Sequence, residues 1–132
     1  MSKGYIAIAQ NNDKYDYLKM AYALALSLKA TQKENKFCIC VDEKTKYALT
    51  DKYKEVFDHV VDIPWNDDAG ADTWKIHNKW KYAHMTPFKE SIILDTDMVF
   101  THSVDHWWDY LSKKDMWVCL LYTSDAADDS LR

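Results

Sequence analysis

Short apolar runs alternate along the chain with longer segments in which apolar residues recur at helical spacing. The runs at 5–9, 37–41 and 92–94 are apolar throughout, which is typical of strands covered on both faces of a sheet. Between the first two, the segment from near Asp16 to Ala30 predicts an amphipathic helix. The residues on its apolar face are Leu18, Ala21, Tyr22, Ala25 and Leu28. Strands that alternate with helices predict an α/β fold with a mainly parallel sheet and right-handed crossovers.

Shorter patterns predict the remaining elements. In chain order these are a helix at 45–53, a strand at 56–63, a helix at 74–85, a strand from near 91, a helix at 104–111 and a strand from 116. The spacing in the helix at 74–85 directs Ile76, Trp80 and Ala83 inward. We therefore expect Trp80 to pack against the sheet, whereas Trp65, in the loop before this helix, has an exposed ring that can touch a ligand.

The composition fits one globular domain. The chain has 132 residues, of which 48% are hydrophobic and 14% aromatic, so it can bury a core. A net charge of −4 and scattered lysines argue against nucleic acid or an anionic membrane as the main partner. The chain opens without a signal-peptide pattern and has no membrane-spanning run, which predicts a cytoplasmic protein without membrane insertion. In that compartment Cys38 and Cys40 are expected to be buried, reduced thiols, with a Cys-x-Cys metal site as the alternative.

The last residues differ from the rest of the chain. Arg132 is the only arginine, and the segment 119–128 resembles a translated transposase adapter of the kind used in short-read DNA libraries. We therefore divide the chain into a donor-binding part at 1–118 and a non-native tail at 119–132. The hypothesis is that the genuine product continues past Val118, and a genuine flexible acidic C-terminus is the alternative.

Two carboxylates follow the apolar run at 92–94 directly. A turn at the end of this strand can aim Asp95 and Asp97 at one cation, at the sheet edge where α/β proteins usually bind ligands. Carboxylate oxygens suit Mg²⁺ or Mn²⁺, which in turn bind phosphates. The alternative is that one of the two acids only caps the following turn.

Several ordered motifs together resemble the GT-A glycosyltransferases, most closely the glycogenin-like family 8. In chain order they are Asn12-Asp13-Lys14-Tyr15, Ser27-Leu28-Lys29, Val56-Phe57-Asp58, Lys75-Ile76-His77 and Leu94-Asp95-Thr96-Asp97. The resemblance implies a Rossmann-like GT-A nucleotide-binding half, here incomplete. It also implies a nucleotide-sugar donor, usually a UDP-sugar, which is held with Mn²⁺ (or Mg²⁺), and an acceptor that the sequence does not identify.

The resemblance carries roles over to named positions. It implies that Asp95 and Asp97 bind the metal and that Lys75 lies near the donor's phosphates or sugar. The positions that would hold the base and ribose are Ala9, Asn11, Asn12, Tyr15 and Thr96. The alternatives are a plain turn that caps the first helix at Asn11 and Asn12, which turn chemistry also favours, and a solvated lysine at Lys75.

One departure from the family pattern and two alternative interpretations keep other functions open. The family's third metal ligand, a histidine in a later motif, has no counterpart before Val118, so catalytic residues are unknown and the chain is expected to hold a donor half-site. A phosphatase of the haloacid-dehalogenase type is the rival, because Asp95-Thr96-Asp97-Met98-Val99 also fits its first motif, with Asp95 as nucleophile. A third possibility is an inactive nucleotide-binding fragment.

Overall fold

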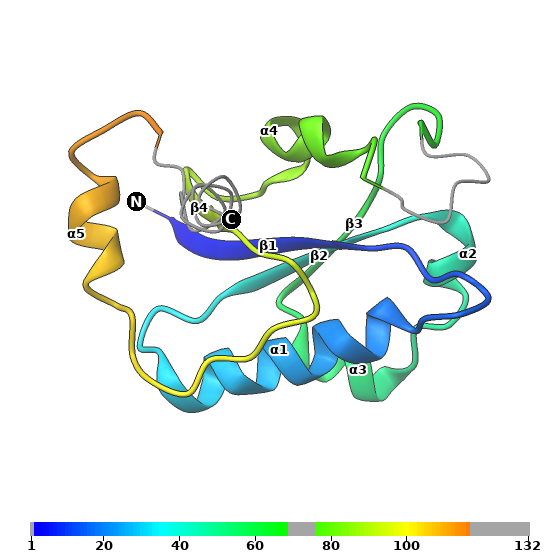
Figure 1. Ribbon diagram of the computed structural model, residues 1–132, viewed down its shortest axis with the longest axis horizontal. Coiled ribbons are helices and arrows are strands. Elements are labelled where there is room, and N and C mark those ends of the chain that lie inside the picture. Colours follow the sequence, from blue (N-terminus) through cyan, green and yellow to red (C-terminus); the bar gives the residue numbers. More distant parts are fainter. Residues whose placement is uncertain (1, 69–75, 117–132) are drawn as a thin grey trace, which may run out of the picture.

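A computed structural model describes residues 2–68 and 76–116, in which four strands form one sheet (Figure 1). The strands are β1 (Lys3–Ala9), β2 (Phe37–Val41), β3 (His59–Asp62) and β4 (Glu90–Ile93). They lie in the order β3-β2-β1-β4, and every pair of neighbours is parallel. The predicted α/β class with a parallel sheet is therefore confirmed.

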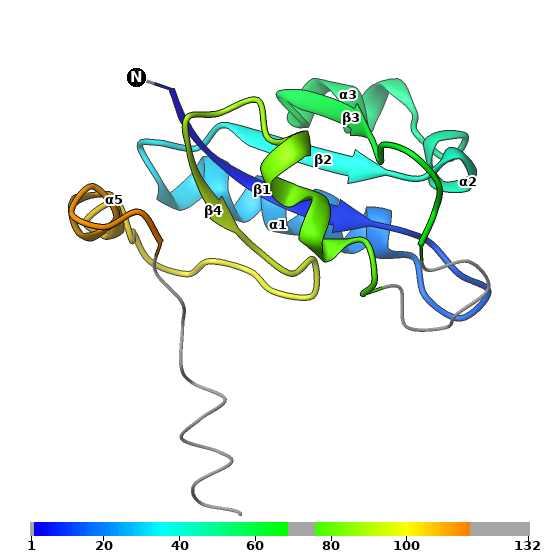
Figure 2. The ribbon, with the colours of Figure 1, turned by 90° about the horizontal axis from the view of Figure 1, so that it is seen from above.

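The helices between strands lie on opposite faces of the sheet (Figures 1 and 2). Helix α1 (Tyr17–Thr31), which joins β1 to β2, covers one face together with α3 (Asp51–Val56). A 3₁₀ turn, η1 (Lys79–Lys81), and helix α4 (Tyr82–Met85) precede β4 and cover the other face. From β1 the chain thus adds β2 and β3 on one side and β4 on the other, so the strand order reverses between β1 and β4.

The larger core lies on the α1 face. The Asp16 side chain caps α1 by accepting a hydrogen bond from the Lys19 N–H at 3.0 Å, and the helix buries one apolar stripe. Its buried residues are Leu18, Ala21, Leu24, Ala25 and Leu28. Trp108, from α5 (Trp107–Leu111), packs edge-on against Tyr5 of β1 with ring centroids 5.5 Å apart. Helix α1 was thus predicted closely, because its pattern follows one uninterrupted face.

The core on the α4 face is smaller. Ile6, Cys38 and Cys40 of the sheet pack there against Tyr82 and other residues that precede β4. The Tyr82 hydroxyl accepts a hydrogen bond from the Ile8 N–H at 3.2 Å, and burial raises the pKa of Tyr82. Both described cysteines are free and buried, as predicted.

Asp58 joins three elements at the amino end of β3. Its carboxylate pairs with Lys29 at the end of α1 and accepts a hydrogen bond from the Phe37 N–H at 2.8 Å. Partial burial by itself raises the pKa of Asp58, but these hydrogen bonds outweigh burial, and the pKa lies below its ordinary value.

Several predicted boundaries differ from the structure. The single helix predicted at 45–53 is two helices, α2 (Glu43–Lys46) and α3, because the chain turns between them. The strand predicted at 56–63 is shorter, since Val56 still belongs to α3. The helix predicted at 104–111 begins at Trp107. The strand predicted from 116 falls almost entirely outside the described residues.

The prediction that Ile76, Trp80 and Ala83 face inward from a helix at 74–85 is wrong. Ile76 is 50% exposed, Trp80 is 59% exposed, and Ala83 is also exposed. The reason is the 3₁₀ turn, whose tighter winding changes which side chains face the sheet. Lys81 and Tyr82 are buried instead. No helix in the described ranges is both long and apolar enough to span a membrane.

Candidate ligand-binding edge of the sheet

The acidic pair lies at the carboxyl end of β4, beside β1. The Leu94 N–H donates to the Ile6 carbonyl at 2.9 Å, so β4 remains paired with β1 up to the residue before Asp95. Asp95 and Asp97 are exposed, and Thr96 between them is buried. The two carboxylates therefore lie at the carboxyl end of one of the two strands between which the strand order reverses, which is the usual ligand site of open α/β sheets.

A lysine from another element lies against the first of these acids. Lys79 Nζ, in η1, is 2.7 Å from Asp95 Oδ1. Both side chains are largely exposed, at 47% for the lysine and 65% for the aspartate. Asp95 therefore already attracts a cation in the protein, at the position where a metal is predicted.

The loop between β1 and α1 is organised by its two asparagines. Asn11 Oδ1 accepts from the Leu18 N–H at 2.9 Å, and its Nδ2 donates to Asp16 at 3.0 Å. Asn12 Oδ1 accepts from the N–H groups of Lys14 and Tyr15 at 2.9 and 2.8 Å. These bonds are the turn chemistry that the sequence left open, and they hold the loop in one conformation.

Two further predicted base-binding residues lie on either side of these asparagines. Ala9 is fully buried at the end of β1. The Tyr15 side chain is 41% exposed, and its ring lies 5.8 Å from that of Tyr17, measured between centroids. The ring of Tyr15 thus remains accessible from solvent at the predicted edge, whereas Ala9 presents only backbone there.

A buried polar network joins the segments at this edge. Gln10, after β1, donates through Nε2 to Asp42 and Asp67, at 3.2 Å in both cases. Its Oε1 accepts from Asn78 Nδ2 at 2.9 Å, and the same Nδ2 donates to Asp67 at 2.7 Å. The Asn11 N–H also donates to the Thr45 hydroxyl at 2.8 Å. The network therefore fixes the ends of β1 and β2 against the loop after β3 and the segment before α4.

Lys81 is the charged residue at the centre of this network. Its side chain is fully buried, and Nζ donates to the carbonyls of Pro64 and Asn66 at 3.1 and 2.6 Å. It also donates to Asn78 Oδ1 at 2.8 Å and lies 3.4 Å from Asp68. Since a buried charge is costly unless it is paired and hydrogen-bonded, these partners are needed to keep the ammonium inside.

Two tryptophans stack on the surface above this lysine. The rings of Trp65 and Trp80 are 5.5 Å apart between centroids and 4° from parallel, and both side chains are more than half exposed. Trp80 Nε1 donates to Asp68 at 2.9 Å, and His84 packs edge-on against both rings. The prediction of an exposed Trp65 is confirmed, whereas Trp80 stacks on Trp65 instead of packing against the sheet.

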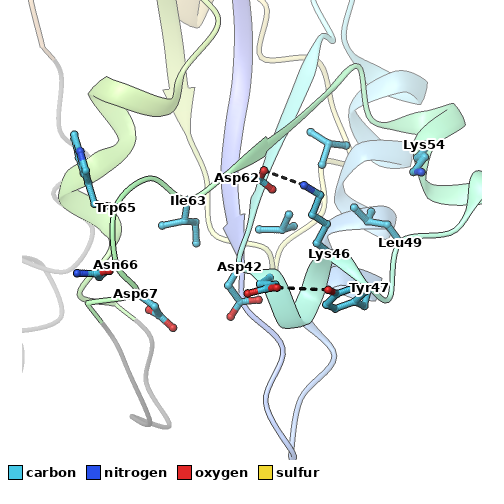
Figure 3. A pocket seen from close by; sticks show the side chains of 13 residues that line it. Asp42, Lys46, Tyr47, Leu49, Lys54, Asp62, Ile63, Trp65, Asn66 and Asp67 are labelled. Carbon is cyan, nitrogen blue, oxygen red and sulfur yellow. Dashed lines mark hydrogen bonds and ion pairs between the residues drawn. The ribbon is translucent and has the colours of Figure 1, made fainter.

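A cleft of about 880 Å³ opens at the carboxyl ends of β2 and β3 (Figure 3). Its volume lies in the range of small-molecule sites. Four carboxylates line it, those of Asp42, Glu43, Asp62 and Asp67, together with two lysines, of which Lys46 pairs with Asp62 at 2.9 Å. The acidic wall does not suit a bare anion.

The cleft and the predicted site residues lie at one edge but do not coincide. Asp95, Asp97 and the 11–15 loop do not line the cleft, which lies on the β2 and β3 side. Sequence reasoning missed Asp42, although it follows the apolar run at 37–41 just as Asp95 follows that at 92–94. Gln10, Asn78 and Lys81 carried no sequence signal. Lys75 falls outside the described residues.

The described residues offer few metal ligands at any one place. Among residues 2–68 and 76–116, no three His, Cys, Asp or Glu side chains come together as a metal site. A divalent ion at this edge would therefore rely on the two carboxylates and on ligands from a bound molecule. The fold and this edge together define an α/β protein with a parallel sheet and polar side chains at its carboxyl edge. No protein-family model, curated protein or solved structure matches the chain.

Proposed function

We propose that this protein binds a nucleotide-sugar donor, of the UDP-sugar class, as the donor-binding part of a GT-A-type glycosyltransferase. Asp95 and Asp97 would hold Mn²⁺ or Mg²⁺, which would neutralise the diphosphate. The observation that carries the proposal is the position of this pair. It follows β4, which pairs with β1, at the point where the strand order reverses, and the ordered 11–15 loop follows β1 at the same edge of the sheet.

The residues present fit a divalent ion of this kind. Mg²⁺ is commonly bound by one or two carboxylates together with substrate phosphates, so a third protein ligand is not required for binding. Lys79 at Asp95 acts as a stand-in cation and supports the attraction of positive charge to this position. When bound, the metal would offset the negative charge of the leaving nucleotide diphosphate.

The chain's own groups would orient the rest of the donor. The exposed ring of Tyr15 offers a surface for the base. The hydrogen bonds of Asn11 and Asn12 hold the backbone of that loop in one conformation, so the loop needs little ordering when the donor binds. The buried Thr96 keeps the turn that carries the two carboxylates against the sheet.

Binding of UDP tests this proposal directly. Thermal unfolding of the protein would be followed with UDP and Mn²⁺ together, with each alone, and with neither. A ligand at about a hundredfold excess over its Kd stabilises the folded state by about 2.7 kcal/mol, which is a measurable rise in Tm. We expect the rise in the wild type and its loss in Asp95→Asn and Asp97→Asn. Asp109→Asn, on α5, is the matched control and should retain it.

Two results would count against the proposal. An equal rise in Tm for Asp97→Asn and the wild type would separate UDP binding from the acidic pair. Hydrolysis of p-nitrophenyl phosphate that Asp95→Asn abolishes, without any stabilisation by UDP, would support the phosphatase instead.

A further inference from the structure

We propose that Lys79 is an exchangeable counter-ion for the metal site. In this proposal its ammonium neutralises Asp95 while no metal is bound, and it moves to the donor's diphosphate when a divalent ion takes that carboxylate. The inference rests on the proposed function and adds a positioning residue to it. Its basis is the contact of 2.7 Å between Lys79 Nζ and Asp95 Oδ1.

The backbone that carries Lys79 is held firmly. Asn78, the residue before it, is fully buried and hydrogen-bonded to Gln10 and Asp67. Lys81, two residues after it, is also fully buried. Lys79 is thus the exposed side chain of a turn whose buried neighbours are fixed, so the backbone that carries its ammonium stays next to Asp95.

The exchange follows from the charge at this position. A divalent ion on Asp95 Oδ1 competes with the Lys79 ammonium for this oxygen, because the two cations repel each other. The ion pair is exposed, so breaking it costs little, and the lysine side chain can rotate away. Lysine carries a compact charge on a flexible stem, which suits an ammonium that changes from a carboxylate to a phosphate.

If the exchange occurs, Lys79 weakens the binding of Mn²⁺ alone and increases the effect of UDP on Mn²⁺ binding. Removing the ammonium frees Asp95, so Lys79→Met should bind Mn²⁺ alone about two- to fivefold more tightly than the wild type. With UDP present, the wild type gains a contact that the variant lacks. UDP should therefore strengthen Mn²⁺ binding by a larger factor in the wild type than in Lys79→Met.

Mn²⁺ affinity would be measured by titration calorimetry and by the electron paramagnetic resonance signal of free Mn²⁺, with and without UDP. Lys89→Met is the matched control, because Lys89 is an exposed lysine at the opposite, amino end of β4. It should behave like the wild type.

Two results would overturn the exchange while leaving the metal site intact. They are an unchanged or weaker affinity of Lys79→Met for Mn²⁺ alone, and an equal effect of UDP in Lys79→Met and the wild type. Failure of the proposed function is recognised separately. In that case Asp95→Asn and Asp97→Asn would leave Mn²⁺ binding as it is in the wild type.

Discussion

Replacement of the buried Lys81 by methionine tests whether the polar network at the carboxyl edge of the sheet stabilises the fold. Methionine has a similar length and removes the ammonium without opening a large cavity. Asn78 is fully buried, and after the change its Oδ1 keeps the Asp68 N–H, at 3.1 Å, as its donor among the described residues. The change also removes the lysine that lies 3.4 Å from the Asp68 carboxylate.

The expected loss can be worked out from the partners of Lys81. Three hydrogen bonds from a charged donor would each be worth about 1.5–3 kcal/mol. Two of them end on the carbonyls of Pro64 and Asn66, in a loop that water can reach, so hydration replaces part of their value. Removing one partner of a buried ion pair costs about 3–5 kcal/mol, but Asp68 is partly exposed. We therefore expect a loss of about 3 kcal/mol in the free energy of unfolding.

Urea denaturation, followed by tryptophan fluorescence and circular dichroism, measures this loss. Lys79→Met is the control, because it removes the same charge two residues away from an exposed ion pair worth about 0.2–1 kcal/mol. The reasoning is refuted if Lys81→Met is as stable as Lys79→Met. That result would mean that the free-energy cost of desolvating the Lys81 ammonium equals the stabilisation from its hydrogen bonds and ion pair.

Three further predictions concern the rest of the fold. Gly4→Ala places a Cβ against the ring of Phe88, so it should cost about 1–3 kcal/mol, and Phe88→Leu should recover part of this loss in the double variant if the clash is the cause. Folding lowers the pKa of Asp58, so its charge stabilises the protein above the ordinary aspartate pKa, and this contribution is lost as pH falls through the lower pKa of the folded state. The difference in the free energy of unfolding between wild type and Asp58→Asn should therefore shrink over that range. A difference that is independent of pH would contradict this reasoning. Hydrogen bonding between the two thiols and burial raise the pKa of Cys40, so Cys38 and Cys40 should react with a thiol reagent only after unfolding. Because the chain also contains Cys119, the label would be located by peptide mapping, and rapid labelling of Cys38 or Cys40 in the native protein would show that the α4 face opens.

The sequence was most informative where one simple period held over a whole element. The apolar runs of β1 and β2 and the apolar stripe of α1 were predicted to within a few residues, because each buries a continuous face. Where short elements follow one another, each is too short for the spacing of its apolar residues to reveal whether it is a helix, a turn or a strand. The segment at 45–56 divides into two helices, and the 3₁₀ turn at 79–81 leaves Trp80 on the surface.

The candidate site was likewise predicted only in part from the sequence. That Asp95 and Asp97 follow a strand, and that polar residues follow β1, was evident from the sequence alone, because strand ends can be recognised from local composition. The prediction that this strand is covered on both faces was wrong, because β4 lies at the edge of the sheet and Ile93 is 57% exposed. The neighbours of these residues were not evident. Lys79 contacts Asp95, and Lys81 is buried in the polar network, only because the order β3-β2-β1-β4 brings the segment before α4 across the sheet to the carboxyl edge. Contacts between residues distant in sequence depend on strand order, and strand order is a property of the tertiary structure.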